Sequence, residues 1–154
     1  MDPIEFRHEP AADFPGWDDW DVADQAVFNP HAMGRLLVRQ ETAAGGQPVS
    51  RLRMFPARQH SNVQHTVHGG ATLALIDISL FAAFKLLLGG HPGNAVTLDL
   101  STQFIGTGHL GEPLDAVVEV LRETGRLAFM RGLVVQGDNT IAAFAGTVRK
   151  PSVK

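Results

Sequence analysis

One stretch of the sequence constrains the fold more than any other. Residues 69–88 read GGATLALIDISLFAAFKLLL and are apolar on every side of a helix. The stretch has about the length of a bilayer-spanning helix. However, Asp77 lies near its midpoint and Lys85 near its end, and charged side chains are costly in hydrocarbon. We therefore expect a helix buried in the core of a soluble protein, with no membrane as a partner.

Short β-type segments flank this helix. Residues 34–42 and 48–55 form a hairpin pattern around a Gly-Gly pair. After the helix, we expect strands at residues 94–104, 114–123, 127–135 and 141–149. Alternation in the first of these places on one face Val96, Leu98, Leu100 and Phe104. The order β-β-α-β-β-β-β predicts an α+β fold in which a curved antiparallel sheet wraps around a long central helix. Because the sheet alone cannot cover a helix that is apolar all round, we also expect an oligomer.

The first 33 residues differ from the rest of the chain. They hold eight of the sixteen acidic residues, both tryptophans and four of the nine prolines. We interpret residues 1–33 as an irregular acidic arm, with a short helical turn around residues 18–27, that docks on the core through Trp17 and Trp20. Residues 34–150 then form one domain, long enough to fold around a single core.

The composition excludes several kinds of chemistry and partner. The chain has no cysteine and no tyrosine, so thiolate nucleophiles, Cys-ligated metals and phenolic acids are ruled out. Thirteen Lys and Arg against sixteen Asp and Glu give a charge of −3, without the basic stripe of a nucleic-acid-binding protein. The N-terminus has no apolar signal segment, and we expect a cytoplasmic location.

Asp77 is the most informative candidate residue. It is the only acidic residue between Arg53 and Asp99, and it lies two turns into the apolar helix. A buried carboxylate is costly unless it is hydrogen-bonded, faces a cavity or has a function. Ser79 and Thr72 could bond it as a structural group. The residues alone leave the structural and the functional interpretation open.

The helix begins at His68-Gly69-Gly70, where unpaired N–H groups favour negative charge, including charge that develops on a carbonyl oxygen. A plain turn is the alternative. Gly70 and Asp77 are seven residues apart, about 10 Å along a helix, which is too far for both to act on one carbonyl carbon. If both act, Asp77 of one subunit must face the helix N-terminus of another, across a two-fold axis.

Other polar residues give weaker signals. The histidines at positions 60, 65 and 68 could surround a metal together with Asp77, but no metal-binding spacing is present and we expect no metal. Arg126 could meet an anionic part of a ligand or serve only solubility. The same holds for Arg131, Arg149 and Lys150.

The start of the helix also resembles a known family. The run from Asn62 to Gly70, NVQHTVHGG, followed by Asp77, resembles the signature of a group of hotdog-fold acyl-CoA thioesterases. This is the phenylacetyl-CoA thioesterase (PaaI-like) group. Residues 96–100, 111–114 and 142–147 resemble that family too. The resemblance covers roughly residues 34–150. It departs at residues 104–108, which lack the proline that relatives commonly carry after this strand.

This resemblance implies a hotdog fold and a homodimer or homotetramer formed as a dimer of dimers. It implies that Asp77 is the nucleophile or general base, that the N–H of Gly69 polarises the thioester carbonyl, and that Asn62 orients water or substrate. It also places Thr97 near the attacking water. We further expect the substrate to contact His68, Gly70 and Arg126.

The expected function is hydrolysis of an acyl-CoA thioester to the free acid and coenzyme A. Because a thiolate leaves readily, one carboxylate and one oxyanion site are sufficient to catalyse this hydrolysis. We expect no cofactor, since coenzyme A is part of the substrate. The alternative is a non-catalytic acyl-CoA-binding or regulatory module on the same fold. A hotdog dehydratase or hydratase would need a different acid–base pair.

Overall fold

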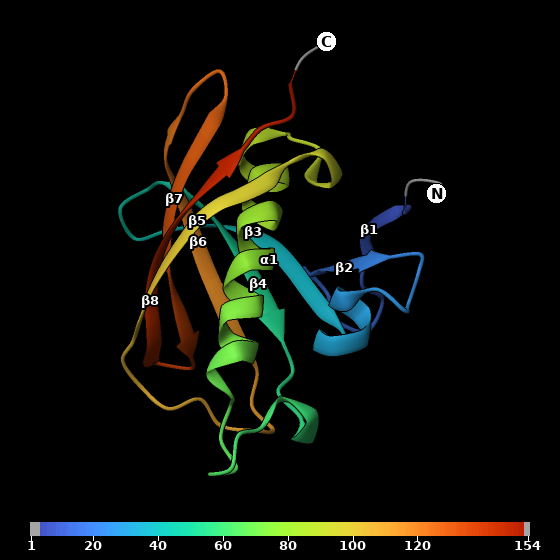
Figure 1. The fold of residues 1–154 in the computed structure, drawn as a ribbon, viewed down its shortest axis with the longest axis vertical. Helices are drawn as coiled ribbons and strands as arrows, with labels where there is room; N and C mark the ends of the chain where they lie inside the picture. Colours follow the sequence, from blue (N-terminus) through green and yellow to red (C-terminus); the bar gives the residue numbers. More distant parts are fainter. Residues whose placement is uncertain (1–3, 153–154) are drawn as a thin grey trace.

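The computed structural model describes residues 4–152 as one antiparallel sheet of eight strands wrapped around a single long helix (Figure 1). The order of strands across the sheet is β1-β2-β3-β4-β6-β7-β8-β5, so β1 and β5 form its two edges. The strands are β1 (Phe6–Pro10), β2 (Asp18–Val22), β3 (Leu36–Thr42), β4 (Pro48–Met54), β5 (Val96–Phe104), β6 (Leu114–Glu123), β7 (Leu127–Gln136) and β8 (Asn139–Arg149). The expected hairpin and the four strands after the helix are confirmed, with ends that differ by a few residues.

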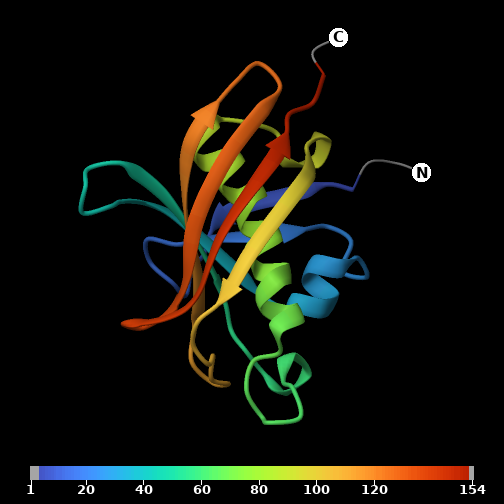
Figure 2. The ribbon, with the colours of Figure 1, turned by 60° about the vertical axis from the view of Figure 1, so that its left-hand side comes forward.

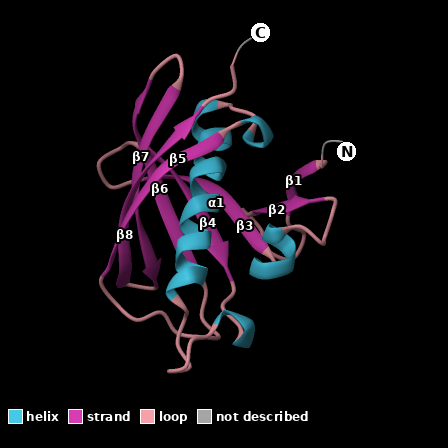
Figure 3. Cartoon of the chain, in the orientation of Figure 1, coloured by secondary structure: helices cyan, strands magenta, loops and turns pink. Residues whose placement is uncertain are grey.

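The helix α1 spans Gly69–Leu88, as the sequence predicts. It ends at Gly89, whose φ of 66° lies in the left-handed region that glycine tolerates best. The side of α1 that faces the sheet packs mainly against β4 and β6 and contains the fully buried Leu75, Ile76 and Leu80. By length and composition α1 could also cross a membrane, but here the sheet wraps around it as around a core helix (Figure 3).

The opposite side of α1 carries a stripe that the described chain leaves partly uncovered. This stripe, which we call the open stripe, consists of Gly70, Leu73, Ala74, Asp77 and Phe81, each half-buried or exposed. On one side of it lies β5, and on the other lies η1, a short π-helical turn at Asn29–Met33 (Figures 1 and 2). The sequence predicts a helix that the sheet does not cover completely, and the described residues agree.

The side chains of the edge strand β5 are not arranged as the simple alternation predicts. A β-bulge lies between Thr97 and Asp99, so the alternation of the side chains changes at Leu98. Of the four apolar residues expected on one face, only Leu100 packs against the core. The other three are between 42% and 53% exposed, namely Val96, Leu98 and Phe104. The prediction that all four share one face was wrong, because the bulge places Val96 on the face opposite to Leu100.

The N-terminal segment is more regular than expected. Strands β1 and β2 form a hairpin that joins the sheet where Asp18 and Asp19 of β2 pair with β3. The short helical turn expected around residues 18–27 was wrong, because β2 takes up the first five of those residues and a single turn, η1, follows later. Trp20 is buried on the helix side of the sheet, with its ring 4.4 Å from that of Phe6.

Trp17 holds the same segment on the other face of the sheet. It is 6% exposed, and the guanidinium groups of Arg39 and Arg53 both lie over its ring, at 4.2 and 4.5 Å from the centroid. The N-terminal segment therefore packs on both faces of the sheet beside β3 and β4, with one tryptophan on each face. The expected docking through Trp17 and Trp20 is confirmed.

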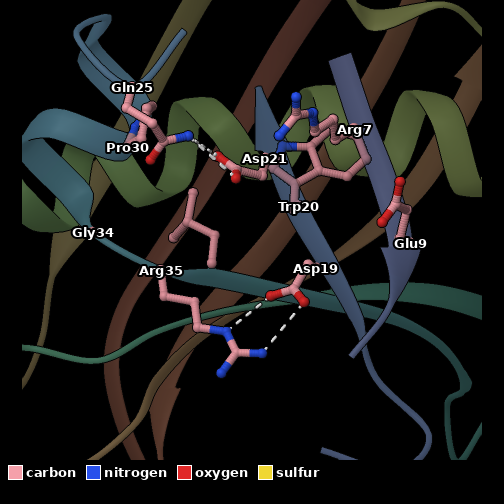
Figure 4. A pocket seen from close by; sticks show the side chains of 10 residues that line it. Arg7, Glu9, Asp19, Trp20, Asp21, Gln25, Pro30, Gly34 and Arg35 are labelled. Atoms are coloured by element: carbon pink, nitrogen blue, oxygen red, sulfur yellow. Dashed lines mark hydrogen bonds and ion pairs between the residues drawn. The ribbon is translucent and has the colours of Figure 1, made fainter. Parts of the chain in front are cut away.

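A cavity of about 480 Å³ lies in this segment, at the opposite edge of the sheet from β5 (Figure 4). Several of its charged groups are already engaged with protein groups. Arg35 binds the carboxylate of Asp19, and the amide of Gln25 donates to Asp21 (Figure 4). Arg35 also binds the carboxylate of Asp13. The Arg35 hydrogen bond holds the pKa of Asp13 below its usual value. We therefore interpret this cavity as part of the attachment of the N-terminal segment.

Candidate active site

The carboxylate of Asp77 accepts a hydrogen bond from the hydroxyl of Thr97, at 2.6 Å between Oγ1 and Oδ1. Asp77 lies halfway along α1 on the open stripe, and Thr97 is near the start of β5. Both side chains are half-buried. The structure thus brings together two of the predicted site residues, which are twenty positions apart in the sequence.

The structural partners considered for Asp77 are not its partners here. The hydroxyl of Ser79 donates to the carbonyl oxygen of Ile76 at 2.6 Å, and Thr72 makes no hydrogen bond to Asp77. Among residues 4–152, the second carboxylate oxygen of Asp77 has no hydrogen-bond or ion-pair partner. Asp77 is therefore fixed by one oxygen, while the other is left without a partner among the described residues.

The start of α1 holds the second predicted group. The ring nitrogen Nδ1 of His68 accepts from the N–H of Gly70 at 2.8 Å, and the carbonyl oxygen of His68 accepts from Ala71 at 2.9 Å. The N–H of Gly69 makes no hydrogen bond with any residue from 4 to 152. Of the two glycines, Gly69 therefore offers the free donor, whereas the N–H of Gly70 is used by the cap that His68 provides.

Asn62 lies in the loop before the helix, and its side chain organises that loop. Its amide nitrogen donates to the hydroxyl of Thr66 at 2.9 Å, and its amide oxygen accepts from the backbone of Gln64 and Thr66. This turn aligns the residues that lead into His68. A local structural role accounts for all these bonds, and the predicted contact with water or substrate stays a prediction.

Arg126 has no hydrogen bond or ion pair with Asp77 or Thr97 among the described residues. It lies exposed in the turn between β6 and β7, beside Arg149 and Lys150 at a cavity of about 590 Å³. Arg149 pairs with Val96 at the beginning of β5, next to Thr97. Lys150 binds Glu123 at 2.7 Å. Arg126 therefore belongs to a basic cluster at the end of β5 where Thr97 also lies.

His60 has a role that the sequence did not reveal. It is 4% exposed, and both ring nitrogens are bonded: Nδ1 accepts from the N–H of Ala57 and Nε2 donates to the carbonyl oxygen of Ala32, each at 2.9 Å. His60 thus ties the loop before α1 to the turn η1. No local signal marks this role, because its partners are backbone groups, one of them 28 positions away.

In the part of the chain that is described, no three His, Asp or Glu side chains gather as metal ligands do.

The two halves of the predicted site do not meet within one subunit. Gly69 and Asp77 are eight residues apart on one straight helix, about 12 Å along its axis. The surface of α1 between Gly69 and Asp77 is apolar, with Leu73 39% exposed. The neighbouring edge strand β5 also has exposed apolar side chains. Phe104 lies at the far end of β5, with its ring against Gly69.

Comparisons with known proteins agree with this architecture. The sequence model of a family described as "Thioesterase superfamily" matches residues 64–143. Acyl-coenzyme A thioesterase 13 from Homo sapiens is 30% identical over 88 residues, which are 57% of this chain and 60% of that protein. The chain thus spans about three fifths of the length of that relative. The mouse protein of the same name is 25% identical over 105 residues, covering 68% of this chain and 74% of its own.

Solved structures show the same fold. Zebra fish thioesterase superfamily member 2 superposes with a TM-score of 0.67 at 25% identity, over 83% of this chain and 89% of its own. The PaaI protein of the E. coli phenylacetic acid degradation operon gives a TM-score of 0.64 at 18% identity, over 83% and 87% of the two chains.

A curved antiparallel sheet around one long helix, with a carboxylate on the helix's uncovered side, defines a hotdog-fold protein. The family match, which covers half of the sequence, is more specific. The chain belongs to the thioesterase superfamily.

Proposed function

We propose that this protein hydrolyses an acyl-CoA thioester to the free acid and coenzyme A, with Asp77 as the catalytic carboxylate. The observation that carries the proposal is the Thr97–Asp77 pair on the open stripe of α1. It is supported by membership of the thioesterase superfamily and by relatives named acyl-coenzyme A thioesterase 13.

In the proposed reaction, Asp77 takes a proton from water as the water oxygen adds to the thioester carbonyl carbon. The negative charge that develops on the carbonyl oxygen is stabilised by the N–H of Gly69. The C–S bond then breaks, and the thiolate of coenzyme A leaves and receives the proton from Asp77. The hydroxyl of Thr97 holds one carboxylate oxygen, so that the free oxygen is the one aimed at water.

Direct attack by Asp77 is the other route. Its carboxylate would form an anhydride with the acyl group and release the thiolate, and water would then cleave the anhydride. A single turnover in ¹⁸O-labelled water identifies the anhydride route if the label enters Asp77. If water attacks the thioester directly, the acid from the first turnover carries the label and Asp77 does not. If water cleaves the anhydride at the Asp77 carboxyl, the label enters Asp77 instead.

The proposed site is shared between two subunits. Since Gly69 and Asp77 are separated by about 12 Å on one helix, a single carbonyl can meet both only if they come from different copies. Two copies packed with their α1 helices antiparallel would bring each Asp77 towards the partner's helix N-terminus, twice, around a two-fold axis. The exposed apolar side chains of β5 and the open stripe would then be covered.

The experiment that tests the function is a thiol-release assay with a panel of aryl-, short- and long-chain acyl-CoAs. We expect turnover of at least one substrate without added metal and unchanged by EDTA. Asp77→Asn should lower kcat by at least about 10²-fold, the scale of losing a catalytic base. Near-normal turnover by this variant would assign Asp77 a structural role.

A non-catalytic acyl-CoA-binding or regulatory module is the second candidate. It predicts that acyl-CoAs bind, as measured by calorimetry, while no substrate in the panel is turned over above background. Loss of activity with EDTA that zinc restores would instead favour a metal site among the histidines.

A further inference from the structure

A second cavity lies against the start of α1, on the side away from β5. Its volume is about 340 Å³. One wall is the helix itself, at Gly70, Ala71 and Ala74, and the other comes from the N-terminal segment, at Phe28 and Met33. Phe28 is 61% exposed, a large fraction for an aromatic ring, and it stands just before η1. The small helix residues leave the space that this ring borders.

The cavity offers few polar groups to an incoming ligand, although four polar residues line it. His60 has both ring nitrogens bonded within the protein, the hydroxyl of Ser61 donates to the carbonyl of Arg58, and Nδ1 of His68 accepts from Gly70. Within residues 4–152, the amide of Gln59 and Nε2 of His68 have no hydrogen-bond partner. A ligand with several amide groups, such as the pantetheine arm of coenzyme A, would leave most of its polar atoms unpaired here.

The position of the cavity connects it to the proposed reaction. Two of its lining residues, His68 and Gly70, flank the free N–H of Gly69. A thioester whose oxygen accepts from that N–H has two substituents, the acyl group and the sulfur arm. The apolar cavity suits the acyl group, and the basic cluster around Arg126 lies at the other end of β5.

We propose that this cavity is the acyl pocket, and that the N-terminal segment determines which acyl group the protein accepts. This inference rests on the proposed thioesterase function. Phe28 and Met33 lie outside residues 64–143, the part of the chain that the family model matches, so this wall comes from the N-terminal segment and not from the matched region. A volume of about 340 Å³ is near the lower end of small-molecule pockets, which suits an aryl or medium-length acyl group rather than a long fatty chain.

The test compares kcat/KM for acetyl-, hexanoyl-, phenylacetyl- and palmitoyl-CoA. For the wild-type protein we expect kcat/KM to rise about fourfold for each methylene added up to hexanoyl, to be high for phenylacetyl, and to fall for palmitoyl. Phe28→Ala removes part of the wall and should lower the hexanoyl-to-acetyl ratio about tenfold. Ala74→Leu fills the space and should lower the same ratio, whereas Phe28→Leu should keep most of it.

Leu121→Ala is the matched control, because Leu121 is an exposed apolar residue of β6 that does not line the cavity. It should leave the ratio unchanged, and thermal melting should confirm that each variant is folded. A ratio that neither Phe28→Ala nor Ala74→Leu changes, or a wild-type protein that prefers palmitoyl-CoA, would overturn the acyl pocket while leaving thioester hydrolysis in place. Absence of turnover with every substrate would instead reject the proposed function itself.

Discussion

Thr97 and Asp77 meet at 2.6 Å because a β-bulge puts Thr97 and Leu100 on the same side of β5. Residues three positions apart normally point to opposite faces of a strand. With the extra residue at Leu98, Leu100 can pack into the core while Thr97 reaches the carboxylate on α1. A local irregularity of the edge strand thus positions the group that holds the catalytic candidate.

Removing the hydroxyl of Thr97 should therefore reduce turnover without unfolding the protein. A hydrogen bond to a charged group contributes about 1.5–3 kcal/mol, so we expect Thr97→Val to lower kcat by about tenfold or more. Thr97→Ser retains the hydroxyl and should stay within about threefold of wild type. Steady-state kinetics with one good substrate measures both. Equal turnover of the valine and serine variants would mean that the hydrogen bond does not act in catalysis.

The exposed side chains of β5 give a prediction about assembly. Leu98 is 52% exposed on this edge strand, next to the open stripe. If β5 is covered by a second copy, Leu98→Glu places a charge in that contact and should shift the protein towards monomers with loss of activity. Sedimentation velocity measures the shift. Leu121→Glu, on β6 and equally 52% exposed, should leave the oligomer intact, and the same shift in both variants would contradict an interface at β5.

Much of the fold could be predicted because its main signals are local. The helix from Gly69 to Leu88 is marked by a long apolar run, interrupted only by Asp77 and Lys85 as charged residues, with glycines at both ends. The turns after it contain glycine and asparagine near the positions where strands end. The N-terminal segment was harder, because β1 and β2 are short, acidic and rich in neighbouring prolines. Their strand conformation depends on pairing with β3 and on Trp17 and Trp20, which are long-range contacts.

The candidate site was predictable in its residue types but not in its contacts. Asp77 is conspicuous as a lone acid in an apolar helix, but nothing in the local sequence selects Thr97 over Ser79 or Thr72 as its partner. That choice follows from the bulge and the position of the edge strand. Likewise, the role of His60 in holding η1 depends on the backbone of Ala32, which no spacing in the sequence indicates.

A charge network on β3, β4 and β6 should make stability depend on pH. Burial works to raise the pKa of Glu41, but hydrogen bonds from Arg51 and Arg39 outweigh it and hold this pKa below its usual value of 4.5. A carboxylate whose pKa is lowered on folding stabilises the folded state above about pH 4.5, and the contribution is lost as the pH falls through the folded-state pKa.

Glu41→Gln should therefore lower the unfolding free energy at pH 7. We expect a loss of about 1 kcal/mol, because the ion pairs of Glu41 with Arg39 and Arg51 are partly exposed, and a smaller loss in acid. Urea unfolding at pH 7 and at about pH 3.5 measures the difference between the two conditions. Glu112→Gln, which removes an exposed carboxylate without an ion pair among residues 4–152, should leave that difference unchanged. An equal loss at both pH values for Glu41→Gln would mean that its charge is not what stabilises the fold.

The shared site can be tested by combining two inactive subunits. Asp77→Asn removes the carboxylate, and Gly69→Pro removes the proposed N–H donor. The structure favours proline at this position: Gly69 is the first residue of α1, and His68 has φ −65° and ψ 137°, the extended conformation that a residue before proline prefers. Gly69→Ala, which keeps the N–H, is the matched control and should remain active.

When the two inactive variants are mixed and allowed to exchange subunits, half of the dimers formed by random pairing contain one chain of each kind. In such a dimer one site has both defects and the other has neither, because Asp77 and Gly69 of each site come from different chains. Activity should therefore recover to about a quarter of wild type, from one intact site in half of the dimers. Exchange is verified by mass spectrometry of differently labelled subunits. If exchange occurs and activity does not return, both groups act within one chain or Gly69 is not the donor, and the geometry proposed for the site is wrong.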